Sequence, residues 1–199
     1  WRALAEFGLE EEADRLGEDV AADLELGPRD REGEAVFAVG LIGEIAADGA
    51  DLVVFPETFI PGYPIWMWRL RPGGDMSLTN ELYGMLFENA VDLESDGLGP
   101  LTAAAKEHAV TLVCGMNERE GAVSRGTLFN TVVVIGANGR VVNRHRKLMP
   151  TNPERMIHGF GDASGLRVID TPVGRIGTLL CWENYMPLAR YALYAQGVE

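Results

Sequence analysis

The sequence contains few cysteines, few basic residues and no long hydrophobic run. Two cysteines in 199 residues are too few for a secreted disulfide scaffold. The 17 basic and 30 acidic residues give a net charge of −13, the wrong sign for binding nucleic acid or an anionic membrane. No apolar stretch approaches the ~20 residues that cross a bilayer, and no signal-peptide pattern stands out. We therefore expect a cytoplasmic protein that binds neither nucleic acid nor membrane.

Acidic residues are concentrated at the start of the sequence. Residues 1–33 are rich in Asp and Glu, and Leu9, Ala13 and Leu16 recur there at helical spacing. This pattern predicts an acidic amphipathic helix or a solvated tail. From residue 34 onward the composition is that of one globular domain, and a chain of this length can fold without disulfides or metals.

Helical and strand-like patterns alternate in that domain, which is typical of an α/β fold. Helices are predicted at 35–47, 77–90, 98–108 and 185–195. Strands are predicted at 51–55, 110–116, 128–136, 140–146, 166–170 and 175–180. The continuous apolar run in the first of these predicts a buried strand. The Asn138-Gly139 pair predicts a hairpin turn between the strands on either side of it.

Three reactive side chains follow predicted strands: Glu57, Lys147 and Cys181. Open α/β sheets carry their chemistry at the carboxyl ends of strands. A cysteine at a strand-to-helix turn is exposed as a nucleophile, and the helix N-terminus lowers its thiol pKa. A carboxylate that moves protons and an ammonium that favours the thiolate would complete a working set. Each residue taken singly also has a common structural explanation. Glu57 would be a loop carboxylate, Lys147 a solvated surface charge and Cys181 an inert buried thiol.

Three sequence blocks around these residues resemble the nitrilase family. They are residues 55–64 (FPETFIPGYP), 145–155 (HRKLMPTNPER) and 180–190 (LCWENYMPLAR). The blocks occur in the family's order, and the third resembles the nitrilase and cyanide hydratase branch. The resemblance runs from about residue 34 to the end of the sequence. It implies an α-β-β-α sandwich, which we expect to be incomplete at both ends because the family's first strand and later strands have no counterpart here.

The resemblance also implies the catalytic residues and the reaction. Glu57, Lys147 and Cys181 would form a triad, with Glu154 as a second glutamate that positions Lys147 or the substrate. The implied reaction is hydrolysis of a small-molecule nitrile by water to a carboxylic acid and ammonia, through a thioimidate and a thioester on the cysteine. Family members use no metal or organic cofactor and associate as dimers or larger homo-oligomers.

Aromatic residues in these blocks have two possible roles. Trp182 and Tyr63 are candidate substrate contacts, although aromatic side chains beside such turns are often packing residues. Glu183 is predicted as a cap of the following helix, and Cys114 as a buried thiol within a strand. His145, like the other two histidines, has no partner at metal-ligand spacing, so a structural role is expected and no metal site.

Other functions are compatible with the same residues. An amidase or carbamoylase could use the same triad, and a cyanide hydratase would stop at the amide. A protein of a different class, a non-catalytic binding module on the same scaffold, would need no reactive Cys181. Product analysis separates the enzymes from one another, and thiol reactivity separates them from the binding module.

Overall fold

The structure is a computed structural model that describes residues 30–71, 73–121 and 123–199. The predicted acidic segment, residues 1–33, lies outside the described residues except for its last four. Those four are Asp30 and the first turn of a helix, so the predicted boundary after residue 33 falls inside that helix. The division into two segments otherwise stays a prediction.

Four α-helices and three short 3-10 helices occur in the described residues. The α-helices are α2 (Arg31–Ala47), α3 (Met76–Asn89), α4 (Gly99–Glu107) and α5 (Pro187–Tyr194). The 3-10 helices are η3 (Ile65–Trp68), η4 (Asn152–Met156) and η5 (Cys181–Tyr185). In the part of the chain that the structure describes, no helix is both long and apolar enough to cross a membrane.

The strands form two sheets. Sheet one has the order β1-β2-β3-β4 and consists of β1 (Leu52–Val54), β2 (Thr111–Arg119), β3 (Leu128–Ile135) and β4 (Val141–Arg146). Sheet two is the hairpin of β5 (Ile169–Thr171) and β6 (Gly174–Ile176). β1 runs parallel to β2, and all other strand pairs are antiparallel. The β3–β4 hairpin turns at the predicted Asn138-Gly139 pair, where Gly139 has a φ of 77°.

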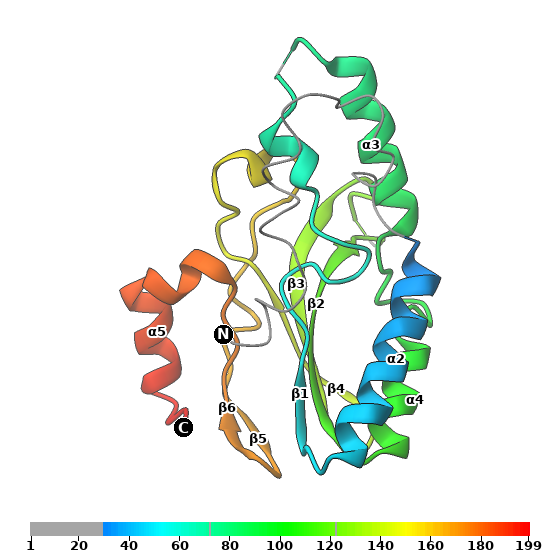
Figure 1. The fold of residues 1–199 in the computed structure, drawn as a ribbon. Coiled ribbons are helices and arrows are strands. Elements are labelled where there is room, and N and C mark those ends of the chain that lie inside the picture. Colours follow the sequence, from blue (N-terminus) through cyan, green and yellow to red (C-terminus); the bar gives the residue numbers. More distant parts are fainter. Residues whose placement is uncertain (1–29, 72, 122) are drawn as a thin grey trace.

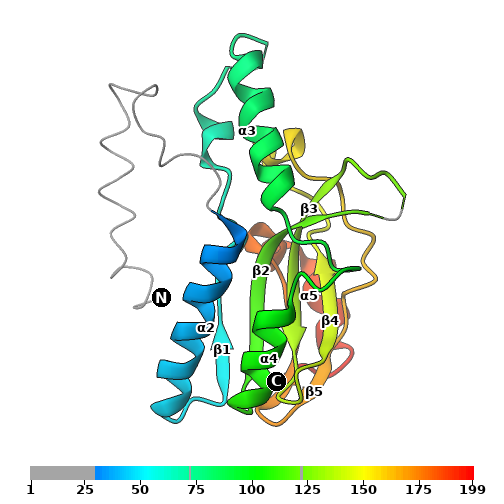
Figure 2. The same ribbon diagram turned by 90° about the vertical axis from the view of Figure 1, so that its right-hand side faces the viewer.

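The elements are stacked in four layers. The helices α2 and α4 cover one face of sheet one, and sheet two lies on the opposite side with α5 outside it (Figures 1 and 2). One apolar core fills the space between the helices and sheet one, with Ile42, Leu101 and Leu112 among its fully buried members. A smaller core, which includes Val134 and Leu180, lies on the other face. This arrangement is the predicted α-β-β-α sandwich.

Two element boundaries differ from the sequence prediction. Helix α2 starts at Arg31, four residues early, because the Asp30 side chain accepts hydrogen bonds from the backbone N–H groups of Glu32 and Gly33. β2 continues three residues beyond Met116, because its polar residues are buried with partners from distant parts of the chain.

The prediction that residues 51–55 form a fully buried strand is wrong on one face. Val53 is buried, but Val54 is 62% exposed. β1 is an edge strand that packs with one face on the helices, and no described residues cover its other face. The last hairpin is also shorter than predicted, because the chain leaves the β5–β6 ladder after Ile176 and runs to Cys181 without strand pairing.

Gly115 allows a close approach between β2 and the segment that follows β1. A Cβ atom on Gly115 would lie 2.7 Å from the Cα of Glu57 and would collide with the Pro56 carbonyl oxygen. The backbone that carries Glu57 therefore passes directly over β2, at a distance that a side chain at position 115 would prevent.

We expect Gly115→Ala to destabilise the protein by about 1–3 kcal/mol, because backbone atoms must move to accept the methyl group. Chemical denaturation measures the change in the free energy of unfolding. The matched control is Gly40→Ala in α2, where nothing lies within 4 Å of the added Cβ and the change should be neutral or stabilising by up to about 1 kcal/mol. Equal effects of the two substitutions would contradict the close approach.

Candidate active site

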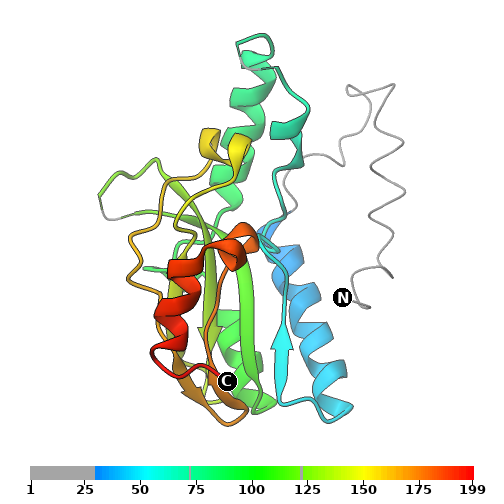
Figure 3. The same cartoon turned by 90° about the vertical axis from the view of Figure 1, so that its left-hand side faces the viewer.

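The four predicted catalytic residues lie in three segments of irregular backbone. Glu57 follows β1, Lys147 directly follows β4, and Glu154 lies in η4. Cys181 is the first residue of η5, after the extended segment that leaves β6. Figure 3 shows η5 beside the end of β1, so the layers of the sandwich bring these segments together.

Lys147 is buried and paired with two carboxylates. Its side chain is 0% exposed, and its Nζ lies 2.7 Å from Glu57 Oε1 and 2.7 Å from Glu154 Oε2. Burial alone would lower the pKa of Lys147, but the hydrogen bonds and charges of the two glutamates outweigh burial and raise it. The lysine is therefore an ammonium ion at neutral pH.

Glu57 is oriented by a residue that the sequence analysis missed. The amide Nδ2 of Asn130 donates a hydrogen bond of 2.6 Å to Glu57 Oε1, the same oxygen that contacts Lys147. One carboxylate oxygen of Glu57 is thus shared by the amide of Asn130 and the ammonium of Lys147. Asn130 is a fully buried amide in the apolar strand β3, and a polar residue in the middle of such a strand is the sequence signal that could have indicated it.

Glu154 accepts hydrogen bonds from two donors besides Lys147. The Thr151 backbone N–H donates to its Oε2 at 2.8 Å, and the Tyr63 hydroxyl donates to its Oε1 at 2.9 Å. Trp68 Nε1 in turn donates to the Tyr63 oxygen at 3.0 Å. Burial raises the pKa of Glu154, but the bonds from Lys147, Thr151 and Tyr63 outweigh this effect and lower it. The structure thus places Tyr63 against Glu154, and its predicted substrate contact stays a prediction.

Cys181 is an exposed thiol on strained backbone. Its φ of 50° is in the left-handed region, which residues with a side chain rarely adopt. Such strain is often found at functional sites and is typical of a turn that presents a nucleophile.

The prediction of a lowered pKa for the Cys181 thiol is wrong. Burial raises this pKa, and so does the nearby Glu57 carboxylate, while Lys147 and the Trp182 backbone N–H lower it by a smaller amount. The net pKa lies above the ordinary thiol value, so the thiol needs a base when it reacts. The electrostatic influence of Glu57, Lys147 and Glu154 on this thiol indicates that the four side chains share one site.

Two aromatic residues of η5 lie at the surface. Trp182 is 58% exposed and Tyr185 is 76% exposed, and their ring centroids are 5.1 Å apart. The structure shows no packing role for Trp182 in the core, and its predicted substrate contact stays a prediction.

Two of the three histidines, His145 and His158, are buried and hydrogen-bonded. His158 Nε2 lies 2.8 Å from Asn117 Oδ1, and burial lowers the pKa of His158 to about 4. His145 is fully buried against Glu183. Among the residues that the structure describes, no group of three or more metal-ligating side chains is arranged to hold a metal ion.

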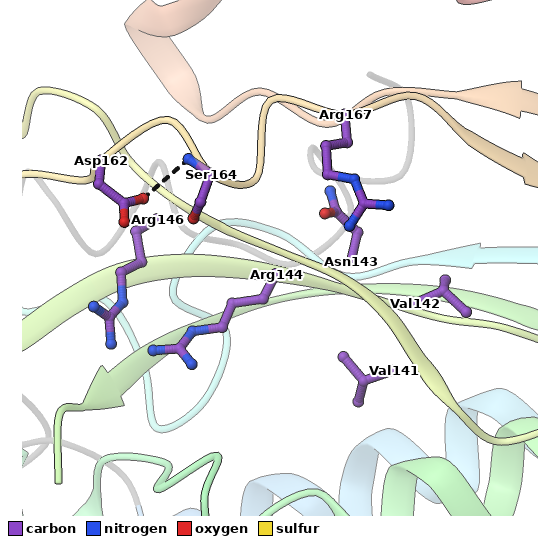
Figure 4. A pocket seen from close by; sticks show the side chains of 8 residues that line it. All are labelled: Val141, Val142, Asn143, Arg144, Arg146, Asp162, Ser164 and Arg167. Carbon is purple, nitrogen blue, oxygen red and sulfur yellow. Dashed lines mark hydrogen bonds between the residues drawn. The ribbon is translucent and has the colours of Figure 1, made fainter. Parts of the chain in front are cut away.

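A pocket of about 450 Å³ lies outside this group of residues, between β4 and the loop before β5 (Figure 4). Two of its arginines, Arg144 and Arg146, both pair with the buried carboxylate of Glu118. Their charge therefore compensates a buried carboxylate, and Arg146 also packs on the ring of Phe129. The pocket contains none of the predicted catalytic residues.

An exposed cysteine on a strained turn, beside a buried lysine held by two glutamates, defines a candidate thiol hydrolase on an α-β-β-α sandwich. The family model described as carbon-nitrogen hydrolase matches residues 22–199. The chain belongs to the carbon-nitrogen hydrolase family, within which its relatives are nitrilases.

Curated relatives agree with this assignment, and solved structures share the fold. The chain is 45% identical to a bifunctional nitrilase/nitrile hydratase of Lupinus angustifolius over 80% of its length, and 41% identical to an aliphatic nitrilase of Rhodococcus rhodochrous over 79%. It spans 45% and 41% of these two relatives, so less than half of their length. Among solved structures, it is similar to an amidase of Nesterenkonia sp. (TM-score 0.63, 16% identity, 87% of this chain and 58% of that one). It is also similar to a carbon-nitrogen hydrolase of Helicobacter pylori (TM-score 0.60, 21% identity, 85% and 53%).

We expect iodoacetamide to alkylate Cys181 more than about tenfold faster than Cys114 at pH 8. Cys181 is exposed, whereas Cys114 is fully buried and burial raises its pKa to about 12. Mass spectrometry of peptides after timed alkylation measures both rates in one sample, and denatured protein gives the reference in which both thiols react. Equal, slow rates in the folded protein would contradict a reactive Cys181.

Proposed function

We propose that this protein hydrolyses a nitrile to a carboxylic acid and ammonia, with Cys181 as the nucleophile and Glu57, Lys147 and Glu154 as its catalytic partners. The observation that carries the proposal is the Lys147 ammonium, held at 2.7 Å by both glutamates within electrostatic reach of the thiol. Sequence identity of 41–45% to nitrilases supports the nitrile as the substrate class.

The first step joins the thiol to the nitrile carbon. Glu57 takes the thiol proton as the sulfur attacks, because the raised pKa of Cys181 leaves most of the thiol protonated at neutral pH. The C≡N triple bond becomes C=N, and its nitrogen receives the proton, which gives a thioimidate. In this proposal Lys147 stabilises the negative charge that develops on this nitrogen.

Two water molecules complete the reaction. Glu57 deprotonates the first water as its oxygen adds to the thioimidate carbon, which forms a tetrahedral intermediate. Glu57 returns this proton to the nitrogen, and the hydroxyl proton of the intermediate follows it, so that the C–N bond breaks, ammonia leaves and the carbonyl of a thioester forms. The second water breaks the C–S bond, releases the carboxylic acid and restores the thiol. In this proposal Glu154 keeps Lys147 charged and in place throughout.

A second product is proposed for the same site. If the tetrahedral intermediate expels the cysteine sulfur instead of ammonia, the product is the amide. The relative from Lupinus angustifolius is named as a bifunctional nitrilase/nitrile hydratase, which supports amide formation as a parallel outcome. The amidase and carbamoylase alternatives use the same residues on a substrate that already contains the amide bond.

We also propose that the protein is a homo-oligomer, as its family resemblance implies. Helix α5 exposes Leu188, Tyr191 and Tyr194, which are 81%, 67% and 54% exposed. Exposed apolar patches of this kind are typical of protein interfaces. The expected cytoplasmic location stays a prediction.

The proposal is tested by measuring ammonia, acid and amide together after incubation with a panel of aliphatic and aromatic nitriles and the matching amides. We expect acid and ammonia from at least one nitrile, and a loss of more than about 10⁴-fold in Cys181→Ala, because no other group can form the covalent intermediate. Cys114→Ala is the matched control and should keep its activity, since Cys114 is buried within β2. Ammonia release by Cys181→Ala at the unmodified rate would overturn the mechanism.

A further inference from the structure

Glu183 is a fully buried carboxylate, and it is not one of the two carboxylates that pair with the Lys147 ammonium. Both of its oxygens accept a hydrogen bond from a backbone N–H group. Oε1 accepts from Leu148 at 2.7 Å, and Oε2 accepts from Leu180 at 2.7 Å. His145 Nε2 lies 3.1 Å and 3.0 Å from the same two oxygens.

The two backbone donors are the immediate neighbours of the reactive residues. Leu148 directly follows Lys147, and Leu180 directly precedes Cys181. Neither leucine lies in a strand or helix, so no sheet ladder joins the two segments at this point. The Glu183 carboxylate therefore bridges the lysine segment and the cysteine segment with one hydrogen bond to each.

The ionised form of Glu183 suits this bridging position. Burial raises the pKa of Glu183, but the bonds from His145, Leu148 and Leu180 outweigh burial and lower it. An ionised carboxylate has acceptors on both oxygens, whereas an amide of the same size has one acceptor and one donor. Position 183 thus requires a carboxylate for chemical reasons beyond the helix cap that the sequence predicted.

We propose that Glu183 is a positioning residue for the nitrile reaction, because its carboxylate fixes the distance between Lys147 and Cys181. The buried His145 side chain is a third hydrogen-bond donor to the Glu183 carboxylate. The inference rests on the proposed function, since it assigns those two residues to one reaction. Glu183 acts through the backbone of its neighbours and does not contact the substrate in this proposal.

The functional reason for fixing this distance is electrostatic. Lys147 favours the thiolate form of Cys181, and its effect falls off as the two groups separate. Small displacements of reacting groups can lower a rate by as much as about 100-fold. A rigid link between the two segments keeps the ammonium within reach of the sulfur while the substrate binds and leaves.

A double-mutant cycle tests the link without any turnover of substrate. The charged groups that face the Cys181 thiol are Glu57, Lys147 and Glu154. In the otherwise unmodified protein, Lys147→Met should slow iodoacetamide alkylation of Cys181 at pH 8 by about tenfold, which equals one pKa unit. In the Glu183→Gln background, the same substitution should slow it by less than about twofold. Equal slowing in both backgrounds would overturn the proposal.

Glu118→Gln is the matched control for the loss of a buried carboxylate. Glu118 is 1% exposed and binds Arg144 and Arg146, but it contacts neither Leu148 nor Leu180. In this background Lys147→Met should still slow alkylation by about tenfold. A loss of coupling in Glu118→Gln as well would show a general effect of destabilisation and would overturn a specific role of Glu183.

Steady-state kinetics give a second readout. We expect Glu183→Gln to lower kcat on a nitrile by about 100-fold and to change KM less than about threefold, because it displaces reacting groups and no substrate contact. A change in KM alone would overturn the assignment. If the unmodified protein turns over no nitrile, the proposed function fails, while the alkylation cycle still tests the link.

Amide hydrogen exchange tests the link in the unmodified protein, even where a variant does not fold. The N–H groups of Leu148 and Leu180 should exchange at least about 100-fold more slowly than unprotected amides, although both lie outside strands and helices. Unprotected exchange at either residue would show that Glu183 does not hold that segment, and would overturn the proposal.

Discussion

The structure around the candidate site depends on one buried ammonium ion. Lys147 has a fully buried side chain, and a charged group in that position is stable when carboxylates and hydrogen bonds replace the lost water. Glu57 and Glu154 supply this replacement. Glu57 lies far before Lys147 in the sequence, and Glu154 lies seven residues after it. In the proposed mechanism, the same pairing that allows the charge to be buried also supplies a base and an ammonium near Cys181.

Most of the fold could be predicted from local sequence patterns. The Asn138-Gly139 hairpin and the helices over 76–107 follow from apolar periodicity and turn residues, whereas the layers of the sandwich are what the resemblance to the nitrilase family implies. The errors arose where distant contacts decide the structure. β2 continues through Asn117 and Glu118 because His158 and Arg144, remote in sequence, satisfy their buried polar groups. The exposure of β1 depends on its place at the edge of the sheet, which its own residues do not encode.

The candidate site was predicted in part. Three reactive residues after strands could be found from the sequence, and the nitrilase-like blocks added Glu154. The supporting residues Asn130 and Glu183 could not be found from the sequence, because their hydrogen-bond partners are far away in the chain. The raised pKa of Cys181 could not be predicted either. It results from burial and from charges of opposite sign, and the distances to those charges are known only once the chain is folded.

The most direct test of the buried ammonium is an NMR titration of the lysine side chains. The sequence contains two lysines, so a sample with ¹³C-labelled lysine shows Lys147 and the exposed Lys106 as its internal reference. Lys147→Met assigns the two signals. The account predicts that Lys147 stays protonated beyond pH 10.4, the ordinary lysine value, because both glutamates raise its pKa. Titration of Lys147 below that pH would show a neutral amine favoured by burial, and would contradict the paired ammonium on which the site depends.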